Sequence, residues 1–200
     1  MMIRYLPFIM LTIMCMLQSC NSSGRQTEED RTADSNWHGI SPLEIKNAIE
    51  LFDNDWMALA VGKEGDMNAM TISWGEISEL WNKPVLTVYV SSSRYTHEFM
   101  ERNGYFTVTA FPENRRSSLQ YIGTHSGCDG DKLKEAGLTT EFTELGNPIF
   151  KEANLAIECR IIYKAPFVKE DIAEDVAEIY DNGMGVHTMY IGEIINVWKK

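Results

Sequence analysis

Six short runs rich in β-branched and aromatic residues, separated by Gly, Asn and Pro, constrain the fold of this chain most. Runs of this length and composition are typical of β-strands. The sequence therefore predicts strands at Trp56 to Val61, Ala69 to Trp74, Val85 to Val90, Tyr105 to Phe111, Leu155 to Tyr163 and Met189 to Val197. Between the first two, Lys63-Glu64-Gly65-Asp66 predicts a hairpin turn. Six strands of this kind indicate a barrel.

Three helical stretches fall between the strands at irregular intervals, at Thr96 to Arg102, Arg115 to Ile122 and Asp131 to Ala136. Repeated βαβ units would place a helix after each strand, so this spacing favours an antiparallel barrel with appended helices. The predicted fold class is therefore mainly β.

A further helix is predicted to begin at Ser41-Pro42-Leu43-Glu44. Ser can cap a helix, Pro suits its first position, and Glu three residues after the Ser completes a capping box. Leu43, Ala48, Ile49 and Phe52 would form the apolar face of this helix.

The first 20 residues differ from the rest of the chain. Met1 to Arg4 carries one cation, and Tyr5 to Leu17 is almost entirely apolar, which is typical of a secretory signal. Leu17-Gln18-Ser19-Cys20 resembles the lipobox of bacterial lipoproteins, apart from Gln18, and this implies cleavage before Cys20 and acylation of it. A transmembrane anchor is the alternative, but the apolar run is shorter than the roughly 20 residues that cross a bilayer.

We therefore expect a signal peptide at residues 1–20, a flexible tether at 21–38 and one folded domain at 39–200. The tether is rich in Ser, Thr, Asn, Glu and Asp, so it cannot bury enough apolar surface to offset the entropy of ordering it. The expected location is the cell envelope, with the membrane contacted through a lipid anchor only.

The formal net charge of −11 argues against nucleic-acid binding, because Lys and Arg must neutralise the phosphates.

After cleavage, Cys128 and Cys159 remain for chemistry, and their spacing matches no zinc or Cys-x-x-Cys pattern. We expect no metal site. The two cysteines form a disulfide in an oxidising compartment or stay as two buried thiols; the spacing leaves both open.

The segment Ser91-Ser92-Ser93-Arg94-Tyr95-Thr96, where a strand gives way to a helix, is suited to a phosphate. Amides at a helix start have no intrahelical partner and lie at the positive end of the helix dipole. Arg94 adds a planar set of charged donors and the hydroxyls add neutral ones. The alternative is a Ser-rich capped turn in which Arg94 pairs with a surface acid such as Glu98.

A second segment, Asn68 to Trp74, alternates small polar with apolar residues and is followed by Gly75. A planar heterocycle could lie along such a strand, with main-chain groups reading its polar edge. The alternative is an ordinary barrel strand whose Thr71 and Ser73 face solvent.

These segments resemble the flavin-reductase-like FMN-binding family. The resemblance rests on motifs that occur in the family's order: Asn68-Ala69-Met70-Thr71-Ile72-Ser73-Trp74, Trp81-Asn82-Lys83-Pro84, Arg94-Tyr95-Thr96, Gly123-Thr124-His125-Ser126-Gly127 with Asp131-Lys132, Glu158-Cys159, and His187 with Tyr190-Ile191-Gly192-Glu193-Ile194. It covers about Ile45 to Val197. The sequence departs from the family at Cys128, where relatives often carry another polar residue.

The resemblance implies a six-stranded Greek-key split β-barrel, a homodimer, and one FMN per subunit near the dimer interface. It places Met70 to Trp74 along the isoalloxazine and ribityl chain, Ser91 to Thr96 at the phosphate, and Ser126 and Lys132 on a neighbouring loop. The implied FMN-binding residues are Asn68, Ala69, Met70, Thr71, Ile72, Ser73, Trp74, Ser91, Ser92, Ser93, Arg94, Tyr95, Thr96, Ser126 and Lys132.

The function implied is an FMN-dependent oxidoreductase of the flavin-reductase type, with NAD(P)H or another electron donor giving hydride to the flavin. An envelope compartment is not expected to hold reduced nicotinamides, so two alternatives stay open. One is a non-catalytic, flavoredoxin-like FMN electron carrier tethered to the membrane, and the other is a tethered binding module without flavin. His187 is the candidate catalytic residue, although a histidine at a strand start is more often structural.

Overall fold

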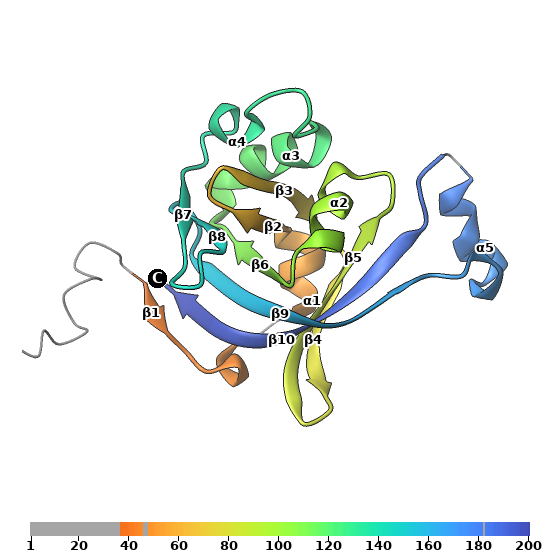
Figure 1. Cartoon of the computed structure of the whole chain (residues 1–200), viewed down its shortest axis with the longest axis horizontal. Helices are drawn as coiled ribbons and strands as arrows, with labels where there is room; N and C mark the ends of the chain where they lie inside the picture. Colours follow the sequence, from red (N-terminus) through yellow and green to blue (C-terminus); the bar gives the residue numbers. More distant parts are fainter. Residues whose placement is uncertain (1–36, 46–47, 182) are drawn as a thin grey trace, which may run out of the picture. The chain divides into compact units, whose positions relative to one another are not determined.

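The computed structural model describes residues 37–45, 48–181 and 183–200. Its main feature is an antiparallel sheet of eight strands in the order β3-β2-β6-β9-β10-β5-β4, with β1 paired to β10 (Figure 1). The strands of this sheet are β1 His38–Gly39, β2 Met57–Lys63, β3 Asp66–Ile72, β4 Gly75–Leu80, β5 Lys83–Ser91, β6 Tyr105–Ala110, β9 Leu155–Pro166 and β10 His187–Lys199. A second sheet pairs β7 Thr140–Phe142 with β8 Pro148–Phe150.

Short helices connect the strands. They are η2 Pro42–Glu44, α1 Ala48–Glu50, η3 Leu51–Asp55, α2 Tyr95–Arg102, η4 Glu113–Arg115, α3 Arg116–Thr124, α4 Lys132–Glu135, η5 Lys169–Asp171, α5 Glu174–Ala177 and η6 Glu178–Tyr180. None of the helices in the described ranges is long and apolar enough to cross a membrane.

The predicted strands and the three predicted helices between them are confirmed, with ends shifted by a few residues. The predicted hairpin turn is confirmed too, because Lys63 pairs with Asp66 across Glu64 and Gly65, and Gly65 has a φ of 80°. The predicted count of six strands is not confirmed. One missed strand, β4, pairs with β5 through a two-residue turn at Trp81 and Asn82.

The missed turn is unusual because two non-glycine residues adopt positive φ angles, 54° at Trp81 and 58° at Asn82. A two-residue hairpin of this twist needs positive φ at both central positions, which Asn tolerates and a bulky Trp rarely adopts. Sequence rules for turns therefore predict such a hairpin at Asn-Gly and do not predict one at Trp-Asn.

The predicted N-terminal helix is wrong in extent. The capping box of Ser41 and Glu44 is present, but the helix ends after one turn because Ile45 is extended, with φ −73° and ψ 116°. Leu43 and Ile49 are 91% and 86% exposed, so no common apolar face forms. Phe52, on the separate helix η3, is the member of the predicted face that is buried in the core.

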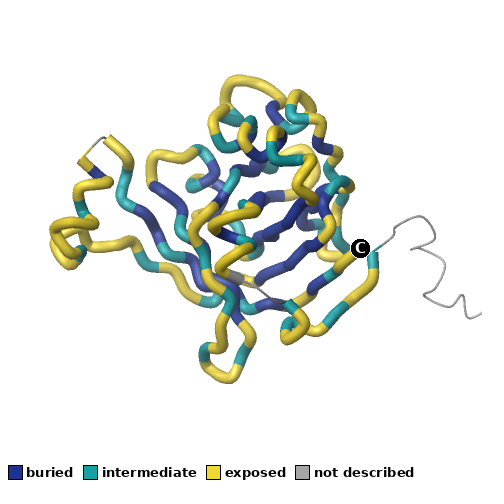
Figure 2. The backbone as a smooth tube through the Cα atoms, turned by 180° about the vertical axis from the view of Figure 1, so that it is seen from behind, coloured by how far each residue is buried: buried dark blue, intermediate teal, exposed yellow. Residues whose placement is uncertain are grey.

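Buried residues gather along the central strands (Figure 2), and the hydrophobic core lies on both faces of the sheet at β2. Met57, Leu59 and Val61 belong to the cluster inside the barrel, and Ala58 and Ala60 belong to a cluster beneath α3. This follows from the two-residue period of a strand, which sends successive side chains to opposite faces. The neighbouring strand β3 is consequently fixed between the core and α3.

The segment that joins β9 to β10 carries η5, α5 and η6 and projects from the sheet (Figure 1). We call residues 163–186 the arm. Several of its apolar side chains are exposed: Tyr163, Phe167, Val168, Val176, Ile179 and Met184. The arm returns to the sheet at His187, next to the end of β5.

Glu158 is a fully buried carboxylate on β9. It accepts hydrogen bonds from Asn147 Nδ2 at 2.8 Å, Asn196 Nδ2 at 2.7 Å and Thr143 Oγ1 at 2.5 Å. Lys63 Nζ in turn donates to Asn147 Oδ1 at 2.8 Å. The network joins β2, the β7–β8 turn, β9 and β10.

The neighbouring Cys159 is also buried, and burial raises the pKa of its thiol well above the usual value. Both thiols are free, so the disulfide alternative is wrong, and the expectation of two buried thiols is confirmed for Cys159 alone, because Cys128 is exposed on a loop.

We expect Glu158→Ala to lower the free energy of unfolding by about 2 kcal/mol, because an unpaired buried amide such as that of Asn147 costs roughly 1–3 kcal/mol. Chemical denaturation of the purified protein measures this. Glu144→Ala, an exposed change on the same β7–β8 turn, is the matched control and should change stability by less than about 0.5 kcal/mol. Equal effects of the two substitutions would contradict the structural role of Glu158.

Candidate functional site

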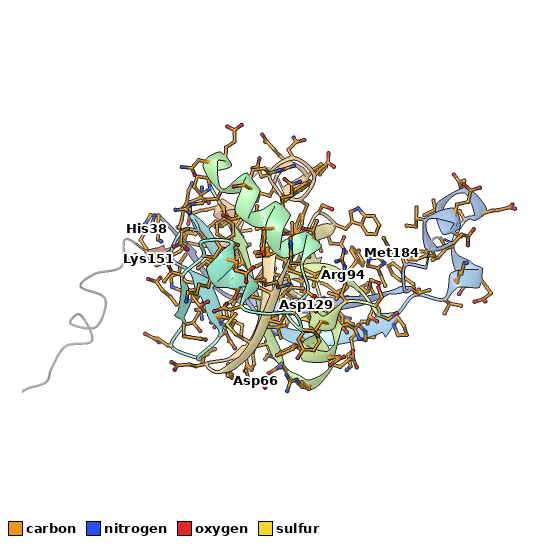
Figure 3. The ribbon with its side chains drawn as sticks, turned by 90° about the horizontal axis from the view of Figure 1, so that it is seen from above. His38, Asp66, Arg94, Asp129, Lys151 and Met184 are labelled. Atoms are coloured by element: carbon orange, nitrogen blue, oxygen red, sulfur yellow. The ribbon has the colours of Figure 1, made fainter. Side chains whose placement is uncertain are left out.

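Two cavities meet at Arg94 and Met70, which line both. The Lys132 cavity has a volume of about 140 Å³ and is lined by Asn68, Met70, Ser93, Arg94, Tyr95, Thr96, Ile122, Thr124, His125, Ser126, Gly127 and Lys132. The Trp74 cavity has a volume of about 150 Å³ and is lined by Met70, Thr71, Ile72, Ser73, Trp74, Tyr89, Ser91, Arg94, Met184 and His187. Figure 3 shows Arg94 between Asp129 and Met184.

Arg94 is positioned by the turn that links β5 to α2. Its amide donates to Ser91 O at 3.0 Å, and Arg94 itself is the extended residue that precedes the helix, with φ −85° and ψ 133°. The amides of Ser92 and Ser93 donate to Val186 O and Ser91 Oγ. The three amides of this turn are therefore used within the protein. The amides without intrahelical partners are those at the start of α2.

Arg94 and Lys132 converge on the C-terminal end of α3. Arg94 Nη1 donates to Gly123 O at 3.1 Å, while Lys132 Nζ donates to Ile122 O at 3.2 Å and to His125 O at 3.0 Å. Helix C-terminal carbonyls carry partial negative charge, so they stabilise both cations. The predicted alternative pairing of Arg94 with Glu98 is absent among the ion pairs of the described residues.

Lys132 is a buried cation beside a second cation. Burial first, and the nearby Arg94 second, lower the pKa of its ammonium group to about 8, while Cys128 acts in the opposite direction. An anion in this cavity would relieve the repulsion between the two cations and replace the water that Lys132 has lost.

The floor of the Lys132 cavity is built by Asn68 and Thr96. Asn68 Nδ2 donates to Thr96 Oγ1 at 2.9 Å, and both residues are buried. Gly127 approaches this pair so closely that a Cβ at its position would lie 2.4 Å from Asn68 Oδ1. The loop can cover the cavity only with glycine at this position.

The lining of the Trp74 cavity is aromatic and, apart from Arg94, uncharged. The His187 ring lies 5.0 Å from that of Trp74, centroid to centroid, and His187 Nδ1 is 3.1 Å from the Tyr180 hydroxyl. Burial lowers the pKa of His187, and Arg94 lowers it further, so its imidazole is neutral at pH 7. Thr71 Oγ1 donates to Leu119 O on α3, so this hydroxyl does not simply face solvent.

The structure brings the predicted site residues together, with two exceptions. Ala69 and Ser92 line neither cavity: Ala69 is fully buried beneath α3, and Ser92 lies in the turn. Their roles as flavin contacts stay predictions, as do those of the residues that do line the cavities.

Sequence reasoning missed Ile122, Tyr89 and Met184 as lining residues. Met184 reaches the Trp74 cavity because Gly185 packs on the serine turn, where a Cβ would lie 2.3 Å from Ser92 Oγ and 2.8 Å from Ser93 N. In the sequence, the Gly183-Met184-Gly185 pattern was the signal that could have identified Met184, since paired glycines often mark a close backbone approach.

The two cavities suit a ligand with an anionic group at one end and a planar ring at the other. The donors at the anionic end are the Arg94 guanidinium, the Lys132 ammonium and the hydroxyls around them. The ring end offers Trp74, His187 and the apolar Met70 and Ile72. A flavin mononucleotide has both ends, so the residues present fit this cofactor.

Comparisons with known proteins agree with this geometry. The chain resembles the crystal structure of a flavoredoxin from Methanosarcina acetivorans, with 26% identity, a TM-score of 0.58 and coverage of 73% of this chain and 68% of that one. It also resembles an FMN-binding domain of a flavin reductases-like enzyme from Shewanella baltica, with 20% identity, a TM-score of 0.60 and coverage of 83% and 78%. An uncharacterized protein of Archaeoglobus fulgidus is 27% identical over 155 residues, 77% of each chain.

The family comparison covers most of the described fold, because the flavin reductase like domain matches residues 56–200. This range contains β2 to β10, both cavities and every residue predicted to contact flavin. The predicted mainly antiparallel β fold and a flavin cofactor are both supported by it and by the structural neighbours. The chain belongs to the flavin reductase like domain family.

Proposed function

We propose that this protein binds FMN across the two cavities and acts as an oxidoreductase of the flavin-reductase type. The observation that carries the proposal is the continuity of a cationic cavity with an aromatic one at Arg94 and Met70. A ligand that fills both must be anionic at one end and planar at the other, as FMN is.

In this arrangement the Lys132 cavity holds the phosphate. Arg94 presents a planar fork of donors, which matches phosphate oxygens, and Lys132 adds a compact charge with one N–H beyond the two used by Ile122 O and His125 O. Thr96 Oγ1 already accepts from Asn68, so its own proton is free to donate to the phosphate.

The Trp74 cavity holds the ring system. Bound flavin supplies the capacity to accept a hydride and to pass electrons on. Tyr180 fixes His187 at Nδ1, which leaves Nε2 for a hydrogen bond within the cavity. Trp74 and Met184 are 46% and 42% exposed, so this side is accessible to a donor such as NAD(P)H. The protein thus orients the reactants and contributes few catalytic groups.

The similarity to a flavoredoxin favours one second candidate, a non-catalytic FMN electron carrier. The two differ in their electron donor. With NADH or NADPH and an added acceptor, a reductase consumes the nicotinamide in many turnovers, whereas a carrier leaves it unconsumed and is reduced by a protein or membrane donor.

Two further proposals concern assembly and location. The exposed apolar residues of the arm, such as Tyr163, Phe167 and Val168, favour a homodimer, which light scattering of the purified protein measures.

We also propose that residues 1–20 are a signal and that Cys20 carries a lipid anchor. Cys20 and the part of the predicted tether up to residue 36 lie outside the residues that the structure describes.

We expect Arg94→Ala to weaken FMN binding by roughly 10- to 100-fold, because hydrogen bonds to charged groups contribute about 1.5–3 kcal/mol. The affinity of the same variant for riboflavin, which lacks the phosphate, should fall less than threefold relative to the parent. Flavin absorbance of the purified variant and fluorescence titration measure both. Arg102→Ala at the C-terminal end of α2 removes an exposed ion pair with Asp66 and is the control that should bind FMN as the parent does. Parent protein that binds no FMN would end the proposal.

We expect FMN affinity to fall as pH rises above about 8, the pKa of Lys132. Above this pH the free protein must take up a proton to bind phosphate, so affinity falls by up to about tenfold per pH unit. Between about pH 7 and pH 8, where the phosphate monoester is already mostly a dianion, affinity is flat. Lys132→Met should remove the pH dependence and weaken binding. The other groups that influence the pKa of Lys132 are Arg94 and Cys128, and Cys128→Ser is the control that should keep the pH dependence. A pH profile unchanged by Lys132→Met would exclude this role.

We expect the full chain to fractionate with membranes and Cys20→Ser to be released from them, because the variant has no thiol to acylate. Fractionation of cells expressing each form, with metabolic labelling by a fatty acid, measures this. Equal membrane retention of the two would favour a transmembrane anchor instead.

A further inference from the structure

Tyr180 is the arm residue whose side chain is buried, whereas the other described residues of the arm are exposed or half-buried. It lies on η6, between the exposed Ile179 and Asp181. Its ring packs edge-on against that of His187, with the two centroids 5.7 Å apart. Because His187 lines the Trp74 cavity, Tyr180 supports the wall of that cavity from behind.

The Tyr180 hydroxyl lies 3.1 Å from His187 Nδ1, and this contact decides which ring nitrogen of His187 carries the proton. Burial, and then Arg94, lower the pKa of His187, so the neutral ring has one N–H donor and one acceptor nitrogen. If Nδ1–H donated to Tyr180, the phenolic proton would have no other acceptor among the residues that the structure describes. A buried donor without an acceptor is costly. If the phenol donates to Nδ1, both groups are paired, and the ring proton lies on Nε2.

A donor at Nε2 matters because few neutral donors of the Trp74 cavity are left for a ligand. Three of the four hydroxyls that line it already donate within the protein: Thr71 to Leu119 O, Ser91 to Gly185 O, and Tyr89 to Glu76 Oε1. His187 Nε2 has no hydrogen-bond partner among the described residues, so an N–H there is available to a ligand. Such an N–H suits a carbonyl oxygen or an unprotonated ring nitrogen and opposes a second donor.

We propose that Tyr180 is a positioning residue of this site: its hydroxyl holds His187 in the Nε2–H form, so that the cavity wall offers a neutral donor to a carbonyl oxygen or unprotonated nitrogen of the bound ring. This rests on the proposed flavin site and adds a residue of the arm to it. Tyr180 acts through His187 and touches no ligand itself. The arm thereby favours rings that carry an acceptor on the edge facing His187.

Histidine ¹⁵N NMR of the flavin-free full chain at about pH 8, where the ring is neutral, tests the first step. The shifts of Nδ1 and Nε2 show which nitrogen carries the proton, and the parent should carry it on Nε2. Tyr180→Phe keeps the ring that packs on His187 and removes the hydroxyl, so Nδ1 should lose its hydrogen bond and the Nδ1–H form should appear. Tyr163→Phe, the same change at an exposed position of the arm, is the control that should leave both shifts as in the parent.

Fluorescence titration with riboflavin and FMN tests the second step. Tyr180→Phe should weaken both flavins by roughly 2- to 10-fold, the size expected for a neutral hydrogen bond, because the contact is made to the ring that both share. His187→Gln places an amide donor near the position of Nε2, and this donor needs no tyrosine to hold its proton. In that background Tyr180→Phe should therefore change either affinity by less than about twofold.

A flavin-free parent with the proton on Nδ1 would overturn the proposal, as would a Tyr180→Phe variant with parental shifts or parental flavin affinity. Equal losses from Tyr180→Phe in the parent and in the His187→Gln background would assign Tyr180 to packing alone, which also overturns it. A parent that shows the Nε2–H form but binds neither flavin would instead contradict the proposed function, and with it the ligand step, although Tyr180 would still hold the tautomer.

Discussion

The convergence of two cations on the end of α3 is the constraint on which the site depends. Arg94 comes from the start of α2 and Lys132 from α4, and the carbonyls of Ile122, Gly123 and His125 hold both. Two like charges would otherwise repel, and one of them is buried. The helix end thus keeps a positive cavity in place before any ligand arrives, which is the preorganisation that tight phosphate binding requires.

The fold positions this cavity through the two-sided burial of β2 and β3. Because α3 packs on one face of these strands and the barrel core on the other, the end of α3 is held beside Asn68 and Thr96. Thr71 strengthens this contact by donating to Leu119 O. The strand that was expected to carry the ring also fixes the helix whose C-terminal end holds Arg94 and Lys132.

Local patterns were enough to predict most strands and the two segments that form the site. Strand composition identified β2, β3, β5, β6, β9 and β10, and the Ser91–Thr96 segment identified Arg94. What local patterns could not predict depends on distant contacts. Met184 reaches the cavity only because the arm folds back on the serine turn, and β4 forms only because its edge position tolerates a largely polar strand.

The close approach of Gly185 to Ser92 and Ser93 couples the arm to the Trp74 cavity. Met184 and His187 lie on either side of this glycine and both line that cavity, so a displacement of the arm would change this part of its wall. A polypeptide bound to the exposed face of the arm would therefore act on the shape of the Trp74 cavity. The absence of a side chain at Gly185 is what brings the arm close enough to the serine turn for such an effect to reach it.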